Sequence, residues 1–351
     1  MKASIQRITL VTDAWQPQVN GVVTTLNKIV EYARAQGIEI DIIHPNNYPN
    51  IPLPTYPEIR MAWRTQGLEQ RLIDFRPDAV HIATEGALGW KVRRLAIKHQ
   101  WPFTTGYHTK YPEYIHQRWP IIPANWVYAL MRRFHKPAKR TFTPAESIAQ
   151  ELLNHGFSDL TLMSRGVDTE LFHPNHRVDN WFQRPIYLYV GRVAPEKNLP
   201  AFLDLELTGT KVVVGKGPDL DKLKQRYPAV QFLGPQYGQA LAQAYASADV
   251  FVFPSLTDTF GVVNIEAIAC GTPVAAYPVT GPKDIITEGI NGCLHEDLQT
   301  AIEKALTLPR ANVHKSIPQY TWAGAAQQFL DNLAPIPLTQ RLKMHSIKAT
   351  S

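Results

Sequence analysis

Two groups of residues in the second half of the sequence combine charges in a way that suits an anionic, hydroxyl-rich ligand. The first is Gly191-Arg192…Glu196-Lys197, where two cations share one short loop. A guanidinium and an ammonium there could neutralise a diphosphate. The second pairs Asp258 with Glu266, with seven residues between them, and carboxylates accept hydrogen bonds from sugar hydroxyls. Together the groups predict a sugar-nucleotide site, although an exposed loop can also carry such charges for solubility.

The segment between the two carboxylates predicts a helix start that can bind phosphate. The apolar run Val250–Phe253 leads into a turn and then into a helical stretch at Val262–Ala269. The amides of Phe260, Gly261 and Val262 would therefore point out of a helix N-terminus, a position that favours anions. Glu266 would lie about one turn further, on an otherwise apolar face, where a carboxylate needs a partner. A structural ion pair is the alternative interpretation.

Two further glycines favour close approach of a ligand to the backbone. Gly21 ends the loop after the first expected strand and opens a helix, and Gly217 closes Gly215-Lys216-Gly217 after a valine-rich strand. A glycine leaves room for phosphate at Gly21, where a tight turn is the alternative, and for a nucleoside at Gly217. The segment Gly215-Lys216-Gly217 lacks the other residues of a P-loop. No G-x-G-x-x-G follows the first strand, and this argues against a nicotinamide cofactor in the first domain.

Alternation of strands and helices must position these residues. Apolar runs at residues 8–12, 38–43, 186–190 and 250–253 read as buried strands separated by helical stretches, which predicts parallel sheets covered on both faces. A chain of 351 residues favours two domains with a cleft between them. We expect an N-terminal domain over 1–165 and a C-terminal domain over 166–318. A polar, basic tail over 336–351 is expected to be disordered.

Composition limits the classes of function. The chain has 44% apolar and 19% charged residues and two cysteines, Cys270 and Cys293, without metal-ligand spacing. We therefore expect reduced thiols, no bound metal and a cytoplasmic location. The N-terminus predicts a strand and not a signal peptide, and no run is long enough to span a membrane. Asp219-Leu220-Asp221 resembles a metal-binding D-x-D, but a helix begins there and capping is the better interpretation.

Positive charge is concentrated in the first half of the chain. Residues 91–140 contain 11 Lys and Arg and a single acidic residue, Glu113, interleaved with tryptophans and tyrosines. This mixture suits the headgroup layer of an anionic membrane. A solvated basic face is the simpler alternative, and nucleic acid is not expected because no binding module accompanies the charge. The candidate membrane and acceptor residues are Lys91, Arg93, Arg94, Trp119, Trp126, Arg132, Arg133, Lys136, Lys139 and Arg140.

With these motifs assembled, the chain resembles the retaining GT-B glycosyltransferases of the large family that includes bacterial lipid mannosyltransferases and sulfoquinovosyl diacylglycerol synthase. The similarity covers nearly the whole sequence. It rests on the opening segment 12–23, the segment Arg165–Pro174 between the domains, the Asp258–Glu266 element and Tyr320-Thr321-Trp322 before a final helix. The family commonly has Glu at the first carboxylate, where this chain has Asp258. The resemblance implies two Rossmann-like domains, with residues 319–335 crossing back to complete the first.

The resemblance also implies roles for individual residues. Gly21 would meet the donor diphosphate from the N-terminal side, Arg192 and Lys197 would clamp it from the other, and Glu266 would hold the ribose. His108, which composition alone gives no reason to single out, would face the transferred sugar. The implied donor is a UDP- or GDP-sugar, and no metal is needed. The implied reaction is hexose transfer to a lipid, such as diacylglycerol or a glycolipid, by a peripheral enzyme at the inner face of the plasma membrane.

Three other functions remain open on sequence grounds. The same donor chemistry could serve a soluble saccharide or polysaccharide acceptor, for example in a GDP-mannose mannosyltransferase. A glycoside hydrolase also uses two carboxylates, but it has no use for a diphosphate clamp. A basic nucleic-acid-binding α/β protein is the most distant reading. The base, the sugar, the acceptor and the oligomeric state cannot be read from the residues.

Overall fold

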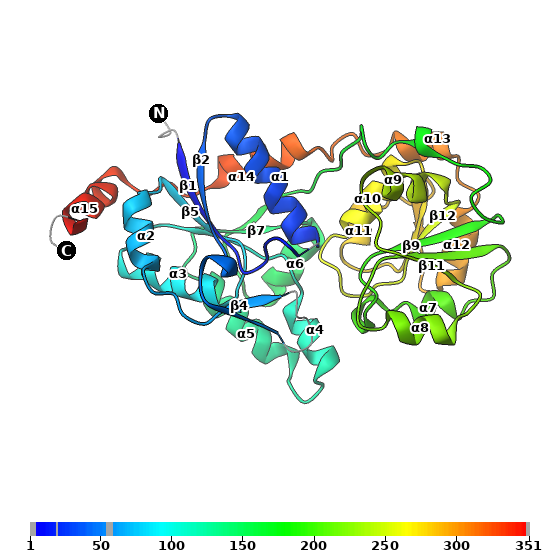
Figure 1. Cartoon of the computed structure of the whole chain (residues 1–351), viewed down its shortest axis with the longest axis horizontal. Coiled ribbons are helices and arrows are strands. Elements are labelled where there is room, and N and C mark those ends of the chain that lie inside the picture. The colour runs from blue at the N-terminus through cyan, green and yellow to red at the C-terminus, as the bar shows by residue number, and fades with distance from the viewer. Residues whose placement is uncertain (1–4, 19, 54–58, 349–351) are drawn as a thin grey trace. The chain divides into compact units, whose positions relative to one another are not determined.

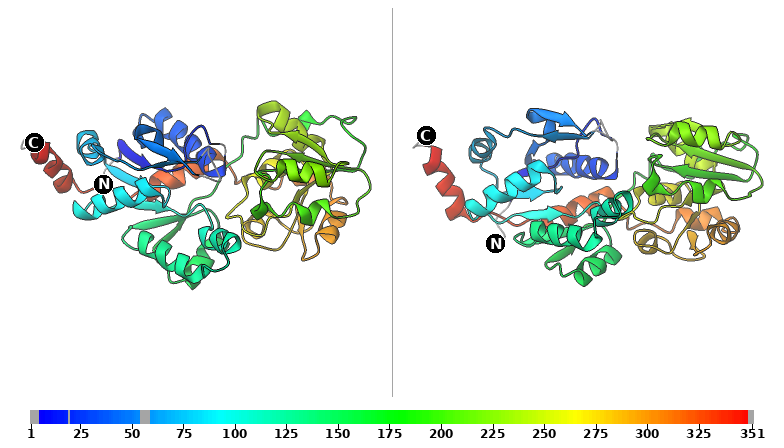
Figure 2. Two further views of the ribbon diagram at one scale, coloured as in Figure 1. Left: turned by 60° about the horizontal axis from the view of Figure 1, so that its bottom comes forward. Right: turned by 90° about the horizontal axis from the view of Figure 1, so that it is seen from below.

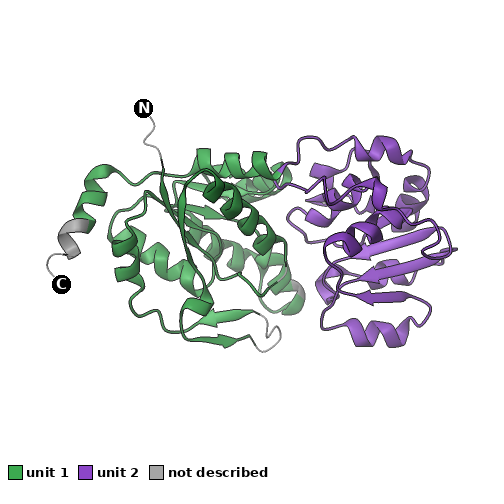
Figure 3. Cartoon of the chain, turned by 45° about the horizontal axis from the view of Figure 1, so that its top comes forward, with its two compact units in different colours: residues 1–164, 322–351 green, residues 165–321 purple. Residues whose placement is uncertain are grey.

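The computed structural model describes residues 5–18, 20–53 and 59–348 and divides the chain into two compact units (Figure 3). Unit 1 runs to Ser164 and resumes at Trp322, and unit 2 comprises Arg165–Thr321. These boundaries lie within a few residues of those expected from the sequence. Each unit is built on one six-stranded parallel sheet, and each sheet carries helices on both faces (Figures 1 and 2). The expected pair of parallel α/β domains is therefore confirmed.

The sheet of unit 1 has the strand order β2-β1-β5-β6-β7-β8. A separate antiparallel hairpin, β3–β4, lies between β2 and α2 in the sequence. The strands are β1 (Arg7–Val11), β2 (Glu39–Ile43), β3 (Asn50–Pro52), β4 (Arg60–Ala62), β5 (Ala79–Ile82), β6 (Thr104–Gly106), β7 (Arg140–Thr143) and β8 (Leu160–Leu162).

Alternating side chains build two hydrophobic cores on the faces of this sheet. Ile8 and Leu10 of β1 join the core under α1 and α14, whereas Val11 joins the core under α2, α3 and α5. This is the period-two pattern of a strand buried on both sides.

The helices of unit 1 are α1 (Gly21–Ala35), α2 (Leu68–Phe75), α3 (Ala87–Lys98), α4 (Tyr111–Arg118), α5 (Ala124–His135), α6 (Glu146–Asn154), α14 (Trp322–Asn332) and α15 (Leu338–Lys348), with a 3-10 turn at Pro45–Asn47.

Unit 2 has the strand order β11-β10-β9-β12-β13-β14, which is that of a dinucleotide-binding Rossmann fold. Its strands are β9 (Ile186–Val190), β10 (Thr210–Val214), β11 (Gln231–Gly234), β12 (Val250–Phe253), β13 (Val274–Ala276) and β14 (Gly292–Leu294). Its helices are α7 (Pro200–Leu203), α8 (Leu220–Arg226), α9 (Gly238–Ser247), α10 (Val262–Ala269), α11 (Pro282–Ile285), α12 (Leu298–Ala305) and α13 (Arg310–His314), with 3-10 turns at Pro174–His176 and Pro195–Lys197.

The end of the chain corrects one expectation. Residues 338–348 form helix α15 and not a disordered tail, and α15 packs against α2. Met344 is 1% exposed in the core of unit 1, and Arg341 forms an ion pair with Asp78. The polar composition that suggested disorder belongs to the solvent-facing side of this helix, where Thr339 and Lys343 are exposed. Among the described helices, none combines the length and apolarity needed to cross a bilayer.

Candidate functional site

The sheet of unit 2 reverses its strand order between two neighbouring strands, β9 and β12. Tyr187 of β9 pairs with Val250 of β12, and connections from these strands run to opposite sides of the sheet. In open α/β sheets, such a reversal leaves a crevice outside the carboxyl ends of the strands, where ligands bind. The loop after β9 carries Arg192 and Lys197, and the loop after β12 carries Asp258. The candidate residues of unit 2 therefore converge on this point.

Lys197 and Asp258 meet at the reversal. The Lys197 ammonium donates to Oδ1 of Asp258 at 2.5 Å, and the two side chains are 18% and 16% exposed. Oδ2 of Asp258 is buried and has no hydrogen-bond partner among the described residues. The neighbouring Asn198 ties the loops together, because its amide donates to the carbonyl oxygen of Pro254 at 3.1 Å. Both loops are thus fixed around a half-satisfied carboxylate.

The glycine-rich segment after β10 packs backbone to backbone against the loop after β9. The amide of Val193 donates to the carbonyl of Lys216 at 3.0 Å, and that of Gly191 donates to Val214 at 3.0 Å. A β-carbon at Gly217 would lie 2.1 Å from the carbonyl oxygen of Val193, which is closer than any side chain tolerates. Gly217 is therefore required by this loop contact.

Helix α10 begins as the sequence predicted, with Gly261 before its first residue. Gly261 has φ +83°, and a β-carbon there would lie 2.6 Å from the Nδ2 atom of Asn264. Phe260 is buried, and its ring contacts that of Tyr320 at 5.8 Å between centroids. Asn264 is fully buried, and neither of its polar side-chain atoms has a partner within the described structure. The loop into α10 is therefore tightly enclosed.

Glu266 has a tyrosine partner and not a cation. The hydroxyl of Tyr245 on α9 donates to Oε2 of Glu266 at 2.8 Å. Burial raises the pKa of Glu266 to about 7, against a smaller lowering by this hydrogen bond. Burial likewise raises the pKa of Tyr245, together with the nearby Glu266 carboxylate. Sequence reasoning missed Tyr245, because 21 residues separate the pair and no spacing rule links α9 to α10.

Asp219 and Asp221 lie at the start of α8, as capping would require. Asp219 occupies the N-cap position without a side-chain capping hydrogen bond, and Asp221 lies in the first turn. Within the described ranges, no group of three or more His, Cys, Asp or Glu is arranged to hold a metal ion.

In unit 1 the candidates Gly21 and His108 follow β1 and β6. Gly21 opens α1, and the side chain of Asn20 caps this helix by accepting from the amides of Val22 and Val23. His108 is 7% exposed, and its ring lies so close to Gly106 that a β-carbon there would be 2.4 Å from Nε2. Strands β1 and β6 lie on either side of β5, so Gly21 and His108 are both at the carboxyl edge of the unit 1 sheet.

A buried contact between a carboxylate and a histidine at the same edge escaped the sequence analysis. Oε1 of Glu85, which follows β5, lies 3.0 Å from Nε2 of His135, and their side chains are 5% and 2% exposed. Nδ1 of His135 lies 2.8 Å from the hydroxyl of Thr105, which contacts Thr141 at 2.9 Å. The one available signal was the position of Glu85 directly after a strand.

A second buried carboxylate, Asp13, fixes the loop that carries Glu85. It accepts from the amides of Leu88 at 3.1 Å and Gly89 at 3.3 Å. Burial raises the pKa of Asp13 in opposition to these hydrogen bonds. Asp13 follows β1, so it bridges the two strands at which the order of the unit 1 sheet reverses.

The basic and aromatic residues of 91–140 divide into two groups. Some guanidinium groups bind backbone carbonyls: Arg93 donates to Phe134 and Arg133, and Arg140 donates to Asn332. These arginines hold helix ends. Around the loop from α4 to α5, by contrast, large apolar side chains are exposed: Trp119 by 51%, Ile121 by 90%, Trp126 by 72% and Leu130 by 52%. Arg133, Lys136 and Lys139 are also exposed.

Comparison with known proteins agrees with this architecture. Residues 184–309 match the family model described as glycosyl transferases group 1, and residues 19–171 match that of glycosyltransferase family 4. A GDP-mannose-dependent alpha-mannosyltransferase of Mycobacterium tuberculosis is 32% identical over 82% of this chain and 83% of its own. An alpha-monoglucosyldiacylglycerol synthase of Streptococcus pneumoniae is 28% identical over 88% and 80%. The structure of a sucrose-phosphate synthase from Thermosynechococcus elongatus superposes with a TM-score of 0.72, at 20% identity over 98% of both chains.

Two Rossmann-like units, one of them with charged loops at its strand reversal, define a glycosyltransferase of the GT-B type that uses nucleotide sugars. The chain belongs to the group 1 glycosyltransferases. The family predicted from the sequence motifs is thereby confirmed.

Proposed function

We propose that this enzyme transfers a hexose, with retention of anomeric configuration, from a UDP- or GDP-sugar to a lipid acceptor at the cytoplasmic face of the membrane. The Lys197–Asp258 ion pair at the reversal between β9 and β12 carries the donor half of this proposal. Lys197 and Arg192 would neutralise the diphosphate, and the amides that open α10 would add hydrogen bonds. Glu266 would accept from the ribose, and Gly217 would admit the nucleoside.

The proposed chemistry is a front-face displacement. The acceptor oxygen forms a bond to the anomeric carbon while the bond from that carbon to the diphosphate oxygen breaks. The acceptor proton passes to the departing diphosphate, so no protein nucleophile enters the reaction. The developing negative charge is stabilised by Lys197, Arg192 and the helix start, which is the role that a metal ion fills in other transferases. Metal independence is therefore part of the proposal.

The acceptor half is assigned to unit 1. Gly21 and His108 lie at the carboxyl edge of its sheet, and they are proposed to reach the donor, Gly21 at the diphosphate and His108 at the transferred sugar. The exposed apolar residues of α5 and of the loop before it, together with the exposed Arg133 and Lys136, would contact the headgroup layer of an anionic membrane. The relative named as a synthase of alpha-monoglucosyldiacylglycerol supports a lipid acceptor.

The test is a transfer assay with purified enzyme, UDP- and GDP-hexoses, and vesicles containing diacylglycerol or a glycolipid. We expect a glycolipid product whose anomeric linkage, read by NMR coupling constants, matches that of the donor, with activity undiminished by a chelator. Inversion of the linkage would refute the displacement proposed here. Transfer to soluble saccharides alone would instead support the reading of a soluble-acceptor mannosyltransferase, and vesicle flotation would then show no binding.

A further inference from the structure

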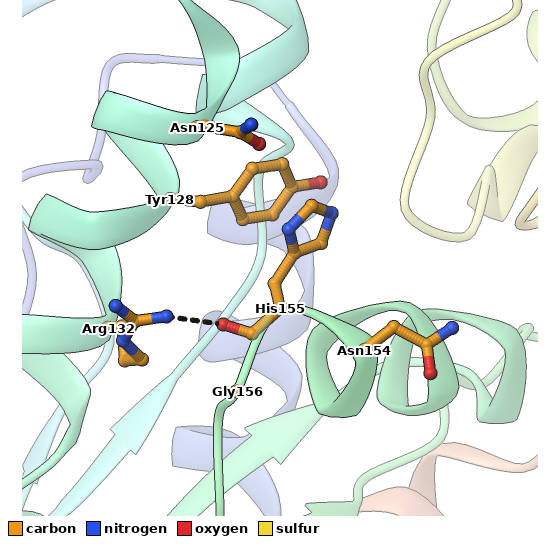
Figure 4. A pocket seen from close by; sticks show the side chains of 6 residues that line it. All are labelled: Asn125, Tyr128, Arg132, Asn154, His155 and Gly156. Atoms are coloured by element: carbon orange, nitrogen blue, oxygen red, sulfur yellow. Dashed lines mark hydrogen bonds between the residues drawn. The ribbon is translucent and has the colours of Figure 1, made fainter.

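A polar hollow lies on unit 1 beside the exposed apolar residues of α5. It has a volume of about 430 Å³ and is lined by Asn125, Tyr128, Arg132, Asn154, His155 and Gly156 (Figure 4). Asn125, Tyr128 and Arg132 are spaced by three and four residues and therefore share one face of the helix. Trp126 and Leu130, at 72% and 52% exposed, occupy the adjacent face. A charged hollow thus adjoins an apolar stripe.

The walls of the hollow are held in place by contacts within unit 1. The rings of His155 and Tyr128 stack with centroids 3.5 Å apart and an interplanar angle of 8°. The Tyr128 hydroxyl bonds to both Glu113 and Glu151, so it links α4, α5 and α6. Nη1 of Arg132 donates to the carbonyl oxygen of His155 at 2.7 Å, which caps the carboxyl end of α6 (Figure 4). The site is therefore preorganised.

The lining offers donors and no acidic side chain. Arg132 retains four further N–H groups after its bond to His155, and a guanidinium is suited to phosphate. The amide oxygen of Asn154 accepts from Gln150, so the Asn154 amide hydrogens remain to be donated outward. Asn125 makes no side-chain hydrogen bond within the described structure, so either the NH2 group or the oxygen of its amide can face the hollow. The partial negative charge at the end of α6 opposes an anion, but Arg132 neutralises it.

We propose that this hollow binds the phosphodiester of an anionic membrane lipid, as a headgroup site separate from the acceptor site. The acyl chains of such a lipid would lie along Trp126 and Leu130, and its phosphate would lie beside Arg132. The inference rests on the proposed membrane attachment of unit 1. Unit 1 would then recognise the phosphate of the lipid, and its attachment would not depend on the negative charge density of the membrane alone.

The test measures binding of the full chain, without nucleotide sugar, to vesicles of digalactosyldiacylglycerol made equally anionic with either phosphatidylglycerol or oleate. Wild type should prefer the phosphatidylglycerol vesicles. Arg132→Gln should weaken binding to them about tenfold and remove the preference. Arg133→Gln, which removes the same charge one residue away, should weaken binding to both vesicles alike, by about fivefold. Asn125→Ala changes no charge and breaks no described contact, and it should reduce the preference without affecting stability.

The possible outcomes separate this inference from the proposed function. Equal binding of wild type to both vesicles, or equal effects of the Arg132 and Arg133 substitutions, would overturn the phosphate site while leaving membrane attachment intact. No binding to any vesicle would overturn both. Since no donor is present, a failure of the glycosyl-transfer proposal cannot affect the result.

Discussion

The ammonium nitrogen of Lys197 lies 2.5 Å from Oδ1 of Asp258, although 61 residues separate them in the sequence. The contact joins the loops after β9 and β12, where the order of the unit 2 sheet reverses. A cation held here by a carboxylate is positioned before any diphosphate arrives. This preorganisation is what electrostatic stabilisation of a leaving group requires. In the proposed function, the carboxylate and the diphosphate would compete for this ammonium.

Replacing Lys197 with alanine should impair the transfer step. Loss of one cation aimed at a developing charge costs about 2–4 kcal/mol of transition-state stabilisation, which is roughly 30- to 1,000-fold in kcat/KM. Steady-state kinetics with saturating acceptor would measure it. Lys222→Ala removes the same charge from an exposed site on α8 and should leave the kinetics unchanged. Near wild-type turnover in a folded Lys197→Ala protein would contradict the clamp.

Removing the competing charge at Asp258 should separate nucleotide binding from catalysis. In Asp258→Asn the Lys197 ammonium loses its anionic partner, so we expect free UDP or GDP to bind more tightly while kcat falls. Isothermal titration calorimetry and turnover measurements would show the two changes in opposite directions. Asp221→Asn, in the first turn of α8, is the matched control. Weaker nucleotide binding in Asp258→Asn would show that the carboxylate itself contacts the ligand.

Glu266 predicts a pH dependence of stability. Its pKa is raised from 4.5 to about 7 by burial, so between these values the folded state binds more protons than the unfolded state. The free energy of unfolding should therefore be highest, with respect to this group, below pH 4.5 and should fall as the pH rises through 7. Denaturant unfolding across this range should show a shallower fall for Glu266→Gln than for wild type. Identical slopes for the two proteins would be incompatible with the raised pKa.

The sequence predicted those features of the fold and site that follow from local pattern. Apolar runs predicted β9 and β12, and the turn before Val262 predicted the start of α10. The contacts that complete the site join residues far apart in the chain. Tyr245 reaches Glu266 only because α9 packs on α10, and no periodicity encodes that contact.

Buried polar groups and weakly apolar helices were also beyond sequence reasoning. The sequence patterns did not single out Glu85, yet its side chain is almost fully buried against His135. Helix α15 was expected to be disordered because its composition is polar, but Met344 supplies enough apolar contact to anchor it. In both cases tertiary packing outweighed the tendency that composition suggested.

Gly217 should be intolerant of a side chain for steric reasons. A β-carbon there would meet the carbonyl of Val193 at 2.1 Å, and the glycine has no left-handed backbone to explain the requirement. Gly217→Ala should therefore displace the loop, lowering both the melting temperature and nucleotide affinity. Gly37→Ala tests backbone strain alone, because Gly37 has φ +79° with open space around it. It should cost about 1 kcal/mol of stability and leave nucleotide binding intact.

Helix α15 should stabilise unit 1 through one buried side chain. Met344 is 1% exposed within the core that α2 and α3 share, whereas Leu342 on the same helix is 54% exposed. Met344→Ala should lower the free energy of unfolding by about 2–4 kcal/mol, and Leu342→Ala by less than about 0.5 kcal/mol. Truncation before α15 should destabilise at least as much as Met344→Ala, because it also removes the partner of Asp78. If thermal unfolding were the same with and without α15, its packing would contribute nothing and the tail would behave as its composition first suggested.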